Sequence, residues 1–191
     1  MNEQYDVAIL GAGFEGSMLG TILACNGAKV VIIDAGTHPR FGLGESTVRH
    51  TFRMIKIIAE RFGVPEFKTE FNSANRIHRH VTSGCGVKTN FGFMLHHEGE
   101  HQRPEESTQL VIPPYREGHE AHLFRQDTDA YLTYTAIHHG ATVKYHTRAK
   151  KVDTDSRGVT IETDKGEIVR ARRAPGIRAL ATIYSTAAGY G

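Results

Sequence analysis

The feature that most constrains the fold is a glycine-rich turn between two apolar segments near the N-terminus. Residues 5–10, Tyr-Asp-Val-Ala-Ile-Leu, are short and apolar with β-branched side chains, as in a buried parallel strand. Apolar side chains then recur at helical spacing as far as Cys25, and Gly27 is placed to end that helix. Residues 29–34 form a second apolar segment. A strand, glycine turn, helix and strand within about 30 residues predict a βαβ unit and an α/β fold.

The turn, Gly11-Ala-Gly13-Phe-Glu-Gly16, has the pattern G-x-G-x-x-G. In such a turn the first glycine permits the tight bend, the second lets the backbone approach a pyrophosphate, and the third lets helix and strand pack closely. The phosphates would lie against free N–H groups at the helix N-terminus. Asp34 ends the second strand, where a carboxylate is placed to accept hydrogen bonds from an adenosine ribose. We therefore expect a dinucleotide site; the alternative is that the glycines serve packing alone.

Composition excludes several other classes of protein. The 191 residues are 39% hydrophobic and 23% charged, which is typical of a globular chain and not of a disordered one. The net charge of only +2 argues against a nucleic-acid binder. No apolar run reaches membrane-spanning length and the first residues do not resemble a secretory signal, so we expect no membrane partner. Two cysteines make neither a disulfide scaffold nor a four-ligand zinc site, so a cytoplasmic location is expected.

The rest of the chain predicts elements that fit the same fold class. Pro39, Gly42 and Gly44 predict a loop over residues 37–46, and a helix with a basic, solvent-facing side should follow over 47–62. Four more strands and one more helix are expected, the strands over 87–95, 110–112, 121–124 and 142–147 and the helix over 126–139. Tight turns separate three short strands of a predicted β-meander, over 150–153, 158–163 and 167–171.

Two segments beyond the βαβ unit resemble a known family. The loop His38-Pro-Arg-Phe-Gly-Leu-Gly-Glu-Ser46 resembles the R-F-x-x-G-E-S loop of flavin-dependent halogenases and of related monooxygenases with the p-hydroxybenzoate hydroxylase fold. Residues 124–132, Phe-Arg-Gln-Asp-Thr-Asp-Ala-Tyr-Leu, are similar to the R-x-x-x-D-x-x-L helix of that group. The strand at 140–143 and the meander follow in the same order, so the resemblance spans roughly residues 4–178. It implies a Rossmann-like FAD-binding domain, with FAD and not NAD as the cofactor.

The resemblance also implies which residues surround FAD. These cofactor-binding residues are Gly11, Gly13, Phe14, Glu15, Gly16, Asp34, Arg40, Gly44, Glu45, Ser46, Arg125 and Ala149. The glycine turn would surround the pyrophosphate, Asp34 would bind the ribose, and residues 44–46 would lie along the cofactor toward its flavin end. Arg125 would approach as a cationic donor, which suits a pyrophosphate, and the alternative is a surface ion pair with Asp129. Ala149 would offer only its backbone to the adenine.

The family chemistry needs a reactive amine. The resemblance implies an oxidoreductase in which FADH2, O2 and halide give hypohalous acid, and a lysine on a strand beyond the G-E-S loop holds this oxidant beside the substrate. The pKa of such an amine must be shifted by burial. Residues 86–95 resemble that strand, so Lys88 is the predicted catalytic residue; Lys68 is the alternative, and each could instead be an ordinary surface lysine. The implied partners are a small aromatic or electron-rich substrate, free or carrier-bound, and a flavin reductase.

One motif points to a different chemistry. The segment from His97 to His101, His-Glu-Gly-Glu-His, matches H-E-x-x-H, which binds zinc when a helix places both histidines on one face. Gly99 lies inside this segment and Pro104 follows it, so a helix is not expected here. We therefore expect no metal site.

The chain departs from the family pattern toward its end. It contains neither the W-x-W-x-I-P motif nor the second flavin motif G-D-A, and where the family has D-A-S-G-F-R it has Arg173-Ala-Pro-Gly-Ile-Arg178. We expect residues 1–178 to form the FAD-binding domain, with 63–122 as an incomplete substrate-side segment and 179–191 as an unassigned tail. The prediction is the FAD-binding portion of a halogenase, truncated and inactive alone. A flavin monooxygenase or reductase that uses no halide, and a non-catalytic nucleotide-binding remnant, are the alternatives.

Overall fold

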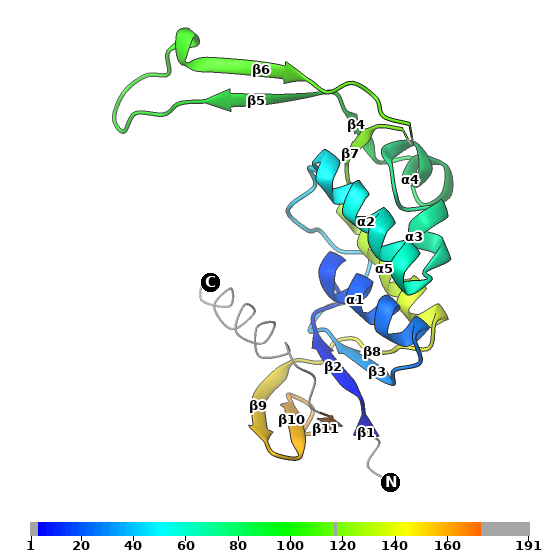
Figure 1. Ribbon diagram of the computed structural model, residues 1–191. Coiled ribbons are helices and arrows are strands. Elements are labelled where there is room, and N and C mark those ends of the chain that lie inside the picture. Colours follow the sequence, from blue (N-terminus) through cyan, green and yellow to red (C-terminus); the bar gives the residue numbers. More distant parts are fainter. Residues whose placement is uncertain (1–3, 117, 173–191) are drawn as a thin grey trace.

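The computed structural model describes residues 4–116 and 118–172, and it confirms the predicted βαβ unit (Figure 1). Strand β2 (Val7–Leu10) leads through the glycine turn into helix α1 (Phe14–Cys25), and β3 (Val30–Ile33) returns parallel to β2. The prediction of one continuous strand over residues 5–10 is wrong in one respect, because Tyr5 is part of β1 (Gln4–Tyr5), which belongs to another sheet. The break is at Asp6, whose N–H and carboxylate both bond to the backbone of Lys29.

The central parallel sheet has the order β2-β3-β8, where β8 spans Thr142–Lys144. Because side chains alternate across a strand, Val30 and Ile32 face one layer while Val31 and Ile33 face the other. The first layer is formed by α1 and α5 (Arg125–His138), which pack against each other over the sheet (Figure 1). The sheet is therefore covered on both faces, which explains why β2 and β3 are apolar throughout.

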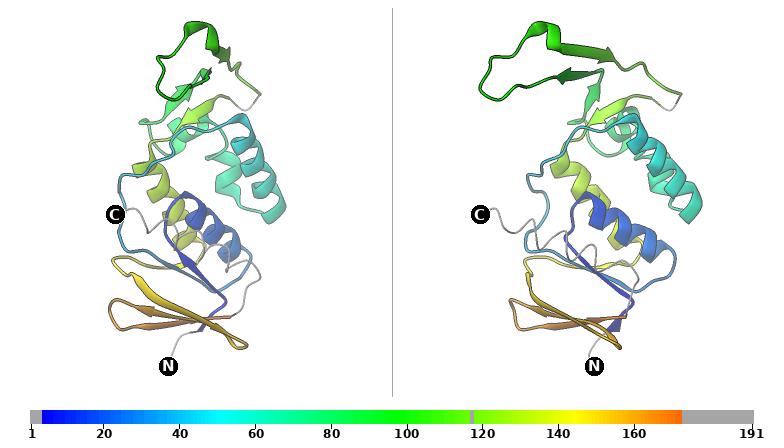
Figure 2. Two further views of the ribbon diagram at one scale, coloured as in Figure 1. Left: turned by 90° about the vertical axis from the view of Figure 1, so that its left-hand side faces the viewer. Right: turned by 60° about the vertical axis from the view of Figure 1, so that its left-hand side comes forward.

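The second layer is the predicted β-meander, which is confirmed (Figure 2). Its strands are antiparallel neighbours: β9 (Ala149–Asp155), β10 (Gly158–Thr163) and β11 (Ile168–Ala171). Strand β1 joins this sheet parallel to β11, a pairing that the local sequence pattern did not predict. Apolar side chains of the meander pack against the central sheet to form a common core, which includes Val31, Ile33, Val159, Ile161 and Val169.

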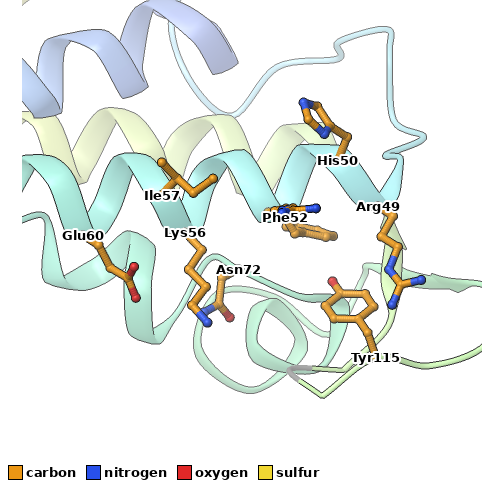
Figure 3. Close-up of a pocket in the computed structure, with 9 residues that line it drawn as sticks. Arg49, His50, Phe52, Lys56, Ile57, Glu60, Asn72 and Tyr115 are labelled. Carbon is orange, nitrogen blue, oxygen red and sulfur yellow. The ribbon is translucent and has the colours of Figure 1, made fainter.

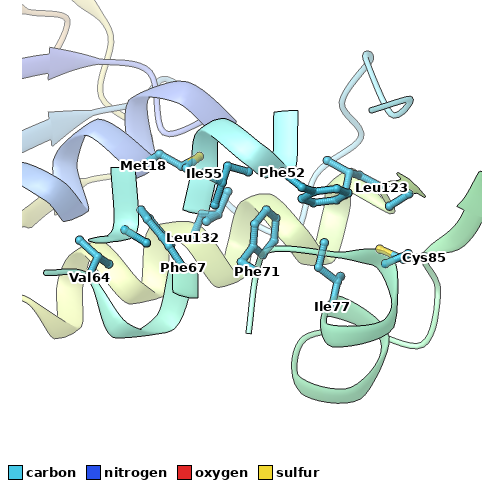
Figure 4. Packing of buried hydrophobic residues seen from close by; sticks show 13 residues of the cluster. Met18, Phe52, Ile55, Val64, Phe67, Phe71, Ile77, Cys85, Leu123 and Leu132 are labelled. Atoms are coloured by element: carbon cyan, nitrogen blue, oxygen red, sulfur yellow. The ribbon is translucent and has the colours of Figure 1, made fainter. Parts of the chain in front are cut away.

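A third core lies among helices on the side of α1 away from the meander (Figure 1), and Figure 4 shows how its side chains pack. The predicted helix is present as α2 (Arg49–Phe62), and two short helices that were not predicted follow it, α3 (Pro65–Thr69) and α4 (Ala74–His80). Both are too short to show a periodic pattern, although Pro65 and the N-cap Ser73 are ordinary helix-start signals. The largest buried side chains of this core include Phe52, Phe67, Phe71, Ile77 and Leu132.

The strand predicted over 87–95 is in fact two strands in two sheets. Strand β4 (Gly86–Lys88) pairs antiparallel with β7 (Glu120–His122) beside the helical core. Strand β5 (Asn90–Met94) pairs with β6 (Ser107–Val111), which is preceded by the 3-10 helix η1 (Pro104–Glu106). This hairpin extends away from the rest of the chain (Figure 1). In the described ranges, no helix is long and apolar enough to pass through a membrane.

Candidate active site

The three glycines of the turn have three different structural roles. Gly11 has a φ of +102°, a conformation that favours glycine. A Cβ at Gly16 would lie 2.1 Å from the carbonyl oxygen of Gly11 and 3.3 Å from the side chain of Ile9, so α1 can pack on β2 only with glycine here. A Cβ at Gly13 would meet only the Asp129 carboxylate, at 4.0 Å. Gly13 thus has an open face, as a turn that receives a ligand requires.

An open pocket of about 450 Å³ begins at this turn. Its lining residues are Gly13, Phe14, Glu15, Gly44, Ser46, Thr47, Thr51, Leu123 and Arg125. The N-cap residue of α1 is Gly13, which has no side chain to cap the helix, so the positive end of the helix dipole and its backbone N–H groups are directed to the region of Gly13. The open glycine and the uncapped helix suit a pyrophosphate.

Arg125 forms the ion pair with Asp129 and also lines the pocket, while its contact with a cofactor stays a prediction. Its Nε and Nη2 atoms each lie 2.8 Å from a carboxylate oxygen of Asp129, so the alternative ion pair is present. Its Nη1 atom donates to the carbonyl oxygens of Leu43 and Gly44, the latter at 3.2 Å. The guanidinium carbon also lies 5.8 Å from the centre of the Phe14 ring. Arg125 therefore connects α5, the loop before α2 and the start of α1 around one pocket.

Asp34 is buried behind the glycine turn. Its carboxylate accepts hydrogen bonds from the backbone N–H groups of Ala12 at 2.6 Å and Gly36 at 2.7 Å, and from both terminal nitrogens of Arg40. Burial raises the pKa of Asp34, but the hydrogen bonds from Arg40 and the two backbone groups outweigh it and hold the pKa below its usual value. Four donors fill the usual acceptor positions of the carboxylate. A ribose hydroxyl would have to share the Asp34 carboxylate with Arg40 or displace Arg40 from it. Ribose binding by Asp34 therefore stays a prediction.

Arg40→Met is expected to lower the free energy of unfolding near pH 7 by roughly 1–2 kcal/mol, the low end for charge-assisted bonds because the guanidinium is partly exposed. The folded-state pKa of Asp34 lies below its unfolded value, so this stabilisation is present above the unfolded pKa and is lost as pH falls through the folded pKa. Urea unfolding at pH 7 and at a pH well below about 4, the unfolded pKa of an Asp, measures this difference. Lys151→Met, which removes an exposed pair with Asp153, should change little. A variant effect independent of pH would contradict the role of Asp34.

Lys88 is brought to the G-E-S loop by the pairing of β4 with β7. Its side chain is buried, and its Nζ atom donates to Ser46 Oγ at 2.7 Å and to the carbonyl oxygen of Thr47 at 2.8 Å. It also lies 3.5 Å from the centre of the Phe91 ring. Burial lowers the pKa of Lys88, while the nearby Glu120 opposes that change. Lys88 is thus not an ordinary surface lysine, whereas Lys68 is exposed on α3.

The remaining predicted residues lie outside the lining of this pocket. Glu45 is exposed, and its carbonyl oxygen accepts from the N–H of Leu123. Ala149 begins β9 and packs against the meander core. Sequence reasoning missed the lining residues Thr47, Thr51 and Leu123, which belong to no recognisable motif. The segments 173–178 and 179–191 lie outside the described residues, so the predicted domain bounds stay predictions.

The H-E-x-x-H segment is not on a helix. His97 and His101 flank a turn beyond β5, where Gly99 has a φ of +76°. The Nε2 atom of His97 lies 3.1 Å from a carboxylate oxygen of Glu106. Across residues 4–116 and 118–172, no three side chains of His, Cys, Asp or Glu come together as a metal site.

A larger pocket, of about 720 Å³, lies beside α2 (Figure 3). Its lining residues are Arg49, His50, Phe52, Arg53, Lys56, Ile57, Glu60, Asn72 and Tyr115. The basic side of α2, predicted to face solvent, thus forms one wall of a hollow. None of the predicted site residues lines this pocket, so its size alone does not make it the active site.

Comparison with curated proteins gives two close relatives, although no protein-family model matches the chain. The chain is 42% identical over 168 residues to tetracycline 7-halogenase of Kitasatospora aureofaciens. It is 43% identical over 168 residues to monodechloroaminopyrrolnitrin halogenase PrnC of Pseudomonas fluorescens. These matches cover 88% and 87% of this chain but only 30% and 29% of the relatives.

Solved structures agree with the sequence matches. A mutant of the halogenase PltM in complex with FAD superposes with a TM-score of 0.76 at 33% identity, over 89% of this chain and 33% of that one. PltM in complex with phloroglucinol and FAD gives a TM-score of 0.74 at 32% identity, over 88% and 33%. The same part of the chain thus matches halogenases in sequence and in fold. Over most of its length, the chain is therefore similar in sequence and in fold to the N-terminal part of flavin-dependent halogenases, and it spans about 30% of the length of the curated relatives.

Proposed function

We propose that this chain binds FAD at the glycine-turn pocket and forms the FAD-binding portion of a flavin-dependent halogenase. One observation carries the proposal: the buried amine of Lys88 is hydrogen-bonded to Ser46, a residue that lines the pocket. The glycine turn and the candidate reactive amine are therefore separated by a single loop. That the relatives are halogenases, and that PltM is crystallised with FAD, supports this choice of cofactor and reaction.

Some residues of the chain would bind the cofactor, and others would hold the reactive amine. When bound in its reduced form, the flavin would supply two electrons which, together with two from the halide, reduce O2 and leave an oxidised halogen species and water. The N–H groups near Gly13 would bind the phosphates, and Arg125 would keep the loop at 43–44 in position. Ser46 and Thr47 hold the Lys88 amine in one place. Because burial lowers the pKa of Lys88, more of the amine carries a free lone pair, which a nucleophile needs.

The substrate side of the reaction lies largely outside this chain. The chain spans about 30% of the length of the curated relatives, so we propose that it does not halogenate by itself. Phe93, Leu110 and Val111 on the β5–β6 hairpin are exposed, as expected of a surface that further chain would cover. By similarity to PltM, which binds phloroglucinol, we propose a small aromatic substrate. A flavin reductase would supply FADH2, and the cytoplasm is the proposed location.

The proposed cofactor is tested by purification and titration of the 191-residue chain. We expect flavin absorbance bands in the purified protein, or saturable FAD binding after the ligand has been removed, with no comparable binding of NAD. The reason is the resemblance of the loop at 38–46 to flavin enzymes, because the glycine turn alone would accept either dinucleotide. Tight NAD binding without FAD binding would contradict the proposal.

A further inference from the structure

Glu120 is a buried carboxyl group with no evident bonding partner. It lies on β7 with 1% of its surface exposed. Neither of its side-chain oxygens has a hydrogen-bond partner among the described residues. A buried carboxylate without hydrogen bonds is costly, so its presence calls for a compensating charge or for a functional reason.

The compensating charge lies directly across the strand pair. Glu120 is the register partner of Lys88 in the antiparallel pairing of β4 with β7. Directly opposed residues project from the same face of a two-stranded ribbon, with Cβ atoms about 4.5–5.5 Å apart. Since the amine of Lys88 donates to Ser46 and Thr47, Glu120 acts on it by charge across the ribbon.

One further cation faces Glu120. Burial raises the pKa of Glu120, while Lys88 and Arg49 lower it. Arg49 comes from α2 and its guanidinium carbon lies 5.6 Å from the centre of the Tyr115 ring, at the edge of the larger pocket. Lys88 has the larger effect of the two cations on the pKa of Glu120, and it is the one that shares the strand pair with Glu120.

We propose that Glu120 is a positioning residue for Lys88, whose charge decides whether the buried amine carries its proton. The inference rests on the proposed function, in which Lys88 is the reactive amine. An ionised Glu120 favours the ammonium form, which donates hydrogen bonds. A neutral Glu120 favours the free amine, which is the nucleophile. The carboxyl group would therefore set the fraction of Lys88 that is reactive at a given pH.

The test is an NMR titration of the lysine ε-carbons in the 191-residue chain, with the Lys88 signal assigned by its loss in Lys88→Met. Glu120→Gln removes the charge at nearly constant shape, and the Lys88 midpoint is expected to fall by about one pH unit or more. Glu120→Asp keeps the charge and should largely restore the midpoint. The control Glu162→Gln removes an exposed carboxylate of the meander and should leave Lys88 unchanged.

Two outcomes would overturn the inference. One is an unchanged Lys88 midpoint in folded Glu120→Gln. If Glu120→Gln does not fold, the reciprocal experiment decides: Lys88→Met must raise the midpoint of the Glu120 carboxyl carbon, and an unchanged midpoint refutes the coupling. Neither titration needs FAD, halide or turnover. Failure of the proposed function would appear separately, as halogenation that survives the loss of Lys88.

Discussion

Gly16→Ala is expected to destabilise the protein by roughly 3 kcal/mol or more, at or beyond the upper end for overpacking. The added Cβ would lie 2.1 Å from a backbone oxygen, and neither α1 nor the turn at Gly11 can retreat without breaking the contact between helix and sheet. At an unhindered helix position the same change stabilises by about 1 kcal/mol, so the expected sign is reversed. Urea unfolding followed by circular dichroism measures the effect. Wild-type stability in this variant would contradict the packing of α1 on β2.

Gly13→Ala is the matched control, since it adds the same methyl group three residues earlier. Gly13 has φ −80° and ψ −172°, which alanine adopts freely, and the new Cβ would meet no atom closer than 4.0 Å. We expect the free energy of unfolding to change by less than about 1 kcal/mol. FAD affinity should fall about 100-fold, which corresponds to about 2.7 kcal/mol, because the methyl group would occupy the space of the phosphates. Unchanged FAD affinity would place the phosphates elsewhere.

Lys88→Ala is expected to reduce halogenation by about 100- to 10,000-fold, the range for loss of a positioned proton-transfer group. The experiment uses the chain joined to a family-like C-terminal region, since we expect no product from the 191 residues alone. Reduced flavin, O2, halide and a panel of phenolic, pyrrolic and indolic substrates are supplied, and halogenated product is measured. FAD should remain bound, because Lys88 contacts Ser46 and Thr47 and does not itself line the pocket.

Lys68, the alternative catalytic lysine, is tested in the same assay as Lys88→Ala. Lys68 is exposed on α3, so Lys68→Ala should leave halogenation close to that of the parent protein. Full activity in Lys88→Ala would remove Lys88 from the mechanism. Product from the 191-residue chain alone would show that the remaining length of the relatives is not needed for turnover. Thermal unfolding of each variant separates lost chemistry from lost structure.

Segments whose structure depends on close sequence neighbours could be predicted from the sequence. The βαβ unit, the loop at 37–46, the helix over 47–62 and the meander all have local signals, such as helical spacing or a tight turn. The roles of the glycines were also predictable, because Gly11 and Gly16 are required by backbone geometry that glycine alone satisfies. The expectation of a halogenase-like chain that binds FAD came from residues 38–46 and 124–132, which lie in contact around Arg125.

Only the tertiary structure decided which segments meet. The strand predicted over 87–95 is divided because its two halves pair with β7 and β6, and strand pairing is set by partners distant in sequence. Short helices such as α3 form because packing around Phe67 stabilises them, since so few residues cannot sustain a helix alone.

The candidate site likewise has features that the sequence determined and features that only the fold determined. The sequence by itself determined that Lys88 was a candidate amine and that Asp34 ended a strand of a dinucleotide fold. It did not determine that Arg40 occupies that carboxylate, or that Glu120 is buried across from Lys88. The physical reason is that burial and charge pairing depend on atoms that folding brings together. The protonation state of a side chain is therefore determined by the groups packed around it in the folded protein, whereas the conformation of a turn is determined by the few residues that form it.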